Sequence, residues 1–116
     1  MSQNAASFPR SRFGTWSLIV AAIAFAIGMV SLTVYLALPD DSSDLAKSVA
    51  TWIFIAGFVG LAPLLHVIGF VFGLIAVFRS YDSRLRGALG LLFNSVAVAI
   101  AVGLVWLGLQ AMAAFT

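Results

Sequence analysis

The sequence contains no cysteine and no glutamate, and only 9% of its 116 residues are charged. Without cysteine there are no disulfides, no thiolate metal sites and no cysteine nucleophile. An ordinary soluble domain has about 25% charged residues, whereas this chain is 63% hydrophobic. These absences exclude a conventional soluble enzyme and point to a membrane protein.

Three long stretches contain no charged residue at all. They lie between Arg12 and Asp40, between Lys47 and Arg79, and after Arg86. Each exceeds the roughly 20 apolar residues that cross a hydrocarbon core about 30 Å thick. The sequence therefore predicts an all-α membrane protein in which three transmembrane helices form an up-down-up bundle.

Turn and charge signals give the expected boundaries of these segments. Pro39 ends the first helix, and Ser42 or Ser43 is an expected N-cap for a second helix that begins near Asp44. The first span is too long for the apolar core of a cleaved signal peptide, so we expect it to be retained. The predicted segments are a basic arm (1–14), the first span (15–38), an acidic loop with the start of helix two (39–48), the second span with a kink near Pro63 (49–78), a basic turn (79–86) and the third span (87–115).

The basic residues are distributed unequally between the two sides of the expected bundle. The N-terminal arm and the second loop hold five, whereas the first loop holds only Lys47. The positive-inside rule then predicts a cytoplasmic N-terminus and second loop, with the acidic loop and the C-terminus outside. These residues flank the membrane spans and form no soluble basic face, so we expect no nucleic-acid partner.

Each span has a stripe of small residues at helical spacing, which is typical of helix–helix contacts in lipid. We expect Gly28, Gly69, Gly73 and Gly90 to lie at such contacts. The full stripes are Ser17, Ala21, Ala24, Gly28 and Ser31 in the first span; Ala62, His66, Gly69, Gly73, Ala76 and Ser80 in the second; and Gly87, Gly90, Asn94, Ala97, Ala101 and Gly108 in the third.

The third span has a second ladder of small residues, Ser95, Ala99 and Gly103, about 100° around the helix. A bundle of three helices has no fourth helix to cover it. We therefore expect Ala99 and Gly103 to contact a partner, either another membrane protein or another copy of this chain.

The polar residues inside the spans are the candidates for chemistry, and His66, Asn94 and Pro63 form the candidate intramembrane site. Folding the second and third spans together places Asn94 level with Gly69 and Gly73, where its amide can join helices. His66 fits a neutral imidazole hydrogen-bonded inside the bundle; a proton relay, or a metal or haem ligand shared by a symmetric dimer, are the alternatives. No catalytic, cofactor or metal site is predicted.

The segment from Gly69 to Ala97 has one glycine pair before a basic turn and a second pair after it. Asn94 follows the second pair. With Gly69, Gly73, Gly87 and Gly90 it resembles a widespread group of small, uncharacterised bacterial integral-membrane proteins. The resemblance covers about a quarter of the chain and implies a multi-pass protein of the bacterial inner membrane, which is the plasma membrane. It implies no activity.

Two functions are consistent with these observations. The first is a non-enzymatic accessory or assembly subunit that binds other membrane helices through the third span. The alternative is a homo-oligomeric pore or small transporter, for which Pro63, His66, Asn94, Ser95 and Gln110 are the available polar groups. No carboxylate lies within any span, so acid–base catalysis and ion coupling through a buried carboxylate are not expected.

Overall fold

The computed structural model describes residues 12–79 and 84–116, and in these residues all regular structure is helical. The first helix is α2 (Phe13–Leu36), and the last is α5 (Arg84–Ala114). Between them a continuous helical segment comprises α3 (Asp44–Phe54), the π-helix η1 (Ile55–Leu61) and α4 (Ala62–Phe78). The prediction of an all-α protein with three helices long and apolar enough to cross a membrane is confirmed.

The second helical segment begins with a side-chain cap. Ser43 has an extended backbone, and its hydroxyl accepts a hydrogen bond from the amide of Ala46 at 3.2 Å. Asp44 lies in the first turn, where a negative charge complements the positive end of the helix dipole. Of the two predicted caps, Ser43 is therefore the one that is used.

The π-helix η1 is a feature that the sequence pattern did not reveal. Its defining bond joins the amide of Ala62 to the carbonyl of Gly57, five residues earlier. In an α-helix, residues five apart point about 140° away from each other, whereas this bond brings Gly57 and Ala62 to one face. Both are buried. The π-helix thus keeps one small-residue face turned toward α2 as the chain approaches Pro63.

Small residues form the contacts between the helices. A side-chain carbon added at Gly73 would lie 2.9 Å from the backbone nitrogen of Leu91, so α4 and α5 touch backbone to backbone. One added at Gly28 would lie 3.4 Å from Ala62. The buried residues of the three long helices are Gly14, Ser17, Ala21, Ala24, Gly28 and Ser31 in α2, Ala62, Gly69, Gly73 and Ala76 in α4, and Gly87, Gly90 and Asn94 in α5.

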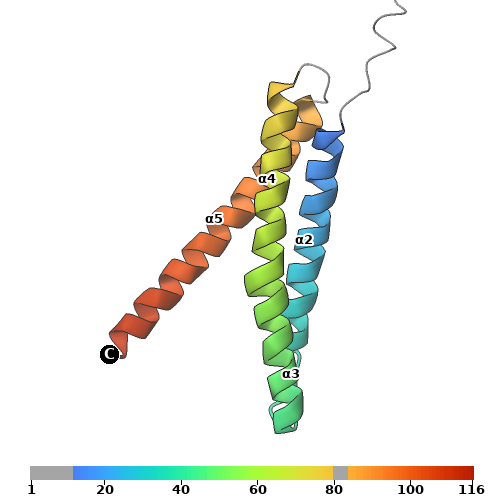
Figure 1. The fold of residues 1–116 in the computed structure, drawn as a ribbon. Coiled ribbons are helices and arrows are strands. Elements are labelled where there is room, and N and C mark those ends of the chain that lie inside the picture. Colours follow the sequence, from blue (N-terminus) through green and yellow to red (C-terminus); the bar gives the residue numbers. More distant parts are fainter. Residues whose placement is uncertain (1–11, 80–83) are drawn as a thin grey trace, which may run out of the picture.

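The third helix leaves the bundle halfway along its length. Figure 1 shows α5 beside α2 and α4 near its start and well separated from them at its C-terminus. Every residue from Val102 to Thr116 is exposed. The expectation that the small-residue stripe faces inward throughout is therefore wrong for Gly108, around which no atom lies within 4 Å of an added side-chain carbon.

The divergence has a physical cause in the other two helices. Beyond Ala24 the small face of α2 is already occupied, because Gly28 packs against Ala62 and Ser31 packs against Gly57. The buried small residues of α2 beyond Ala24 (Gly28 and Ser31) thus face the second helical segment and not α5. The bundle thus contains three packed helices near the ends of α2, α4 and α5 that carry the arginines, and two packed helices beyond that region.

Aromatic and basic side chains tie the helix ends together. Near the start of α2, the ring centroids of Phe13 and Phe72 are 5.5 Å apart. The Arg79 guanidinium carbon lies 5.2 Å from the Phe13 ring centroid. Arg86 donates a hydrogen bond to the Thr15 hydroxyl at 3.1 Å. Residues 80–83 of the predicted basic turn (79–86), which include Ser80 of the second stripe, lie outside the described residues.

Candidate functional site

A polar cluster joins all three long helices where they pack most closely. At its centre is Asn94 of α5, whose side chain is completely buried. It lies against Gly69 of α4, where an added side-chain carbon would be 2.8 Å from the Asn94 side-chain carbonyl carbon. Only a glycine leaves room for the amide at this level, which explains why these two residues occur opposite each other.

The amide nitrogen of Asn94 donates to oxygen atoms on two helices. It lies 2.7 Å from the carbonyl oxygen of Gly90 in its own helix, and 3.3 Å from the carbonyl oxygen of Ser17 in α2. The Ser17 hydroxyl oxygen is 3.4 Å away and itself donates to the carbonyl of Gly69 at 2.7 Å. Ser17 therefore connects α2 to both other helices.

The orientation of the Asn94 amide determines which nitrogen of His66 carries the proton. A backbone carbonyl can only accept a hydrogen bond, so the group 2.7 Å from the Gly90 carbonyl must be the NH₂ of Asn94. The other end of the amide, Oδ1, then faces His66 Nδ1 at 2.9 Å. Since Oδ1 is an acceptor, Nδ1 must donate. In the neutral imidazole the lone pair is therefore on Nε2.

The cluster is internally satisfied with one exception at its edge. Every buried side-chain nitrogen and oxygen in residues 12–79 and 84–116 has a hydrogen-bond partner. His66 is only half-buried, and within that part of the chain its Nε2 has no hydrogen-bond partner. Because a fully enclosed nitrogen would have one, Nε2 must be accessible at the surface of the bundle.

The structure brings together only some of the residues that the sequence singled out. His66 and Asn94 form a hydrogen bond, and Pro63 lies one turn earlier in α4 at the junction with η1. Gly28, Gly69, Gly73 and Gly90 all lie at helix contacts, and an added side-chain carbon at Gly90 would collide with Ser17. By contrast, Ala99 is exposed, and Gly103 has no atom within 4 Å of an added side-chain carbon.

Sequence reasoning placed Ser17 in a packing stripe but missed its part in the polar cluster. The available signal was that Ser17 is the polar member of its stripe nearest the basic end, where Asn94 also lies. For a metal, His66 offers a single nitrogen; no group of three His, Asp or Glu residues that could hold an ion occurs within 12–79 and 84–116. The cluster can thus join helices, and it presents one free acceptor.

Comparisons with protein-family models, with curated proteins and with solved structures find no match to this chain. The resemblance of residues 69–97 to small bacterial membrane proteins therefore stays a prediction.

Proposed function

We propose that this chain is a small non-enzymatic integral membrane protein, an accessory or assembly subunit that binds another membrane helix through α5. The observation that supports this most directly is the isolation of the second half of that helix. From Val102 to Ala114, about 20 Å of apolar helix has every residue exposed. This length is about two-thirds of a hydrocarbon core.

The proposed contact face is the ladder of Ser95, Ala99 and Gly103, which begins before the exposed arm of α5 (Val102–Ala114) and reaches it at Gly103. These residues recur every four positions and so lie along one side of α5. In lipid there is little hydrophobic drive between helices, and small residues favour association by allowing backbones to approach closely. The same device holds Gly73 against the backbone of Leu91 within this molecule. The arm therefore offers a partner a surface of the kind that already packs α4 against α5.

The proposed setting is the bacterial inner membrane, with the N-terminus and the turn between α4 and α5 in the cytoplasm. Arg12, Arg79, Arg84 and Arg86 flank the ends of α2, α4 and α5 that meet at one end of the bundle, whereas Lys47 lies near the other end with Asp40, Asp41 and Asp44. This distribution supports the orientation through the positive-inside rule. In that orientation the isolated half of α5 lies in the outer leaflet.

The polar groups favour a binding subunit over a homo-oligomeric pore. A pore of this size needs polar side chains on a face that several copies can share. Asn94 is instead completely buried and bonded within one copy, and the Ser95 hydroxyl donates to the Leu91 carbonyl of its own helix. Gln110 is exposed on the isolated arm, far along α5 from both. These positions support the use of Asn94 as a tie between helices.

The test is purification of the tagged full-length chain from native membranes in mild detergent, with mass spectrometry of the intact complex. We expect a stoichiometric foreign membrane protein. Gly103→Leu should abolish its recovery, whereas Gly108→Leu is the matched control. Gly108 is equally uncrowded, on the same exposed arm, and about 140° around the helix from Gly103.

Three results would contradict the proposal. One is a pure homo-oligomer, which would favour the alternative of a homo-oligomeric pore. That alternative would then be tested by flux assays on His66 and Asn94 variants. Another is recovery of the partner with both glycine variants. The third is cross-linking from Ala99 or Gly103 in native membranes that yields monomer alone. His66→Leu should leave partner recovery intact, because His66 is not on the arm.

A further inference from the structure

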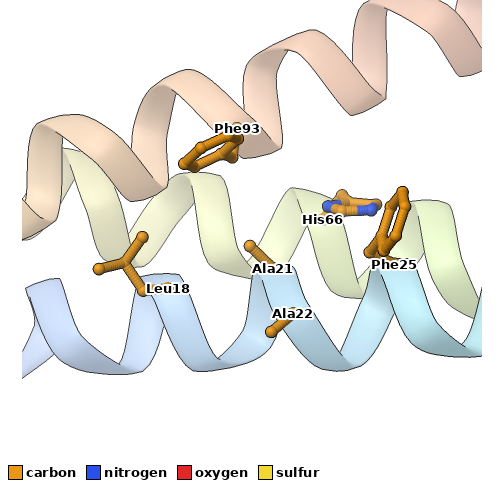
Figure 2. Close-up of a pocket in the computed structure, with 6 residues that line it drawn as sticks. All are labelled: Leu18, Ala21, Ala22, Phe25, His66 and Phe93. Carbon is orange, nitrogen blue, oxygen red and sulfur yellow. The ribbon is translucent and has the colours of Figure 1, made fainter.

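A cleft opens where α5 separates from α2, and His66 lies in its wall. Its volume is about 430 Å³, within the range of small-molecule sites. The residues that line it are Leu18, Ala21, Ala22 and Phe25 of α2, His66 of α4 and Phe93 of α5. Figure 2 shows Phe25 beside the imidazole, with Phe93 reaching toward the space from the opposite helix. The cleft is therefore apolar and aromatic, with a single polar side chain.

The polar side chain in the wall of this cleft has one free acceptor. Asn94 fixes the proton on Nδ1 of His66, which leaves the lone pair on Nε2. Nε2 has no hydrogen-bond partner in residues 12–79 and 84–116, and its ring lines the cleft. Water is scarce within the hydrocarbon core, so such an acceptor is left without a donor unless a ligand supplies one. The site therefore selects a molecule that carries a hydroxyl or N–H group into an apolar space.

We propose that this cleft binds a membrane-soluble aromatic ring bearing a hydroxyl group, of the phenol or hydroquinone class, which donates a hydrogen bond to Nε2 of His66. The short side chains of Ala21 and Ala22 leave room for a ring, and Phe25 and Phe93 provide aromatic surface for edge or offset contacts. A charged ligand would find no counter-ion, because the spans contain no Asp, Glu, Lys or Arg. The proposal concerns binding alone and does not depend on the partner of α5.

The fixed tautomer makes the proposal specific. A hydroquinone presents hydroxyl donors to Nε2, whereas the corresponding quinone and the dimethyl ether present only acceptors. Loss of one hydrogen bond to a desolvated acceptor corresponds to roughly a tenfold loss of affinity. We therefore expect tetramethylhydroquinone to bind about tenfold more tightly than either tetramethylquinone or the dimethyl ether, although the three have nearly the same ring.

The chain is well suited to a direct measurement because His66 is its only histidine. Full-length protein labelled with ¹⁵N-histidine, in lipid nanodiscs under anaerobic conditions, gives one imidazole to follow by NMR. Before ligand is added, Nδ1 should carry the proton. Tetramethylhydroquinone should then shift the Nε2 resonance saturably, with little change at Nδ1, and the dimethyl ether should leave Nε2 unchanged at the same concentration.

Two variants separate binding in the cleft from partitioning into lipid. Ala22→Phe fills the cleft without removing any member of the polar cluster, and should weaken hydroquinone binding at least tenfold. Ala88→Phe is the control, because Ala88 is an exposed residue of α5 that does not line the cleft. It should leave the affinity unchanged.

The proposal is overturned by any of four results. The proton of the free protein could be found on Nε2, or all three ring compounds could bind equally. Ala22→Phe and Ala88→Phe could have the same effect. Finally, Nε2 could respond to Zn²⁺ or haem but not to the hydroquinone, which would make His66 a metal ligand.

Discussion

Replacing Gly73 by alanine should separate α4 from α5, because the two helices meet there without intervening side chains. The new Cβ would lie 2.9 Å from the Leu91 nitrogen, 3.1 Å from the Leu91 Cα and 3.0 Å from the Gly87 carbonyl oxygen. All three are backbone atoms and cannot turn aside as a side chain can. Ordinary contact begins at 3.4 Å, so the helices must move apart by about 0.5 Å.

The magnitude follows from overpacking a close contact, which costs typically about 1–3 kcal/mol. The higher helix propensity of alanine does not offset this cost, because α4 is helical whether or not α5 is docked. We therefore expect Gly73→Ala to weaken the docking of α5 by about 1–3 kcal/mol. Gly103→Ala is the matched control, since no atom lies within 4 Å of its added carbon, and it should not destabilise the bundle.

The absence of cysteine makes the assay simple. A pair of cysteines introduced at Val71 and Leu92, which are exposed on α4 and α5, can carry spin labels. Their separation is followed while a denaturing detergent replaces a mild one, and the midpoint reports the free energy of α5 dissociation. An equal midpoint for Gly73→Ala and Gly103→Ala would refute the claim that backbone contact at Gly73 holds these helices together.

Three further predictions concern single residues. Asn94→Leu removes hydrogen bonds to two other helices, each worth about 0.6 kcal/mol on average, and should weaken α5 docking by about 1–2 kcal/mol in the same assay; an unchanged midpoint would show that the cluster is not a tie. Ser43→Ala should destabilise the start of α3 by about 1 kcal/mol, seen as faster hydrogen exchange at Ala46; exchange at the wild-type rate would argue against the cap. Pro63→Ala supplies a backbone N–H for the carbonyl of Val59, which should favour α-helical over π-helical bonding in η1; solid-state NMR torsion angles unchanged by the substitution would mean that the tertiary contacts alone impose the π-helix.

The sequence predicts the elements of this fold far better than their partners. Long uncharged runs predict three helices, and the serine before Asp44 predicts an N-cap. Both signals depend only on residues that are neighbours in the sequence. A stripe of small residues is local too, but it does not say which other stripe it meets. The stripe of the third span continues to Gly108, yet the matching face of α2 is occupied by Gly57 and Ala62. The divergence of α5 is thus decided by competition between helices.

The π-helix was hidden for a related reason. Counting by 3.6 residues places Gly57 and Ala62 on different sides of a helix, so no α-helical stripe contains both. Their common face exists only once the wider turn has formed. The polar cluster was partly visible, since Asn94 and Gly69 fall at one level when the two spans are folded together. The tautomer of His66 was not, because it depends on which way the Asn94 amide points, and that is determined by the Gly90 carbonyl.

The one-sided attachment of α5 gives the molecule a mechanical property. Its three buried residues, Gly87, Gly90 and Asn94, span about 10 Å of helix, and about 30 Å more extends from Asn94 to Ala114. A rigid rod held over so short a base multiplies displacement: a change of about 0.5 Å at the base moves the tip by about 1.5 Å. A change in the tilt of α5 would therefore move its far end more than the end that packs against α2 and α4, and substitutions near the basic turn should alter the position of that far end.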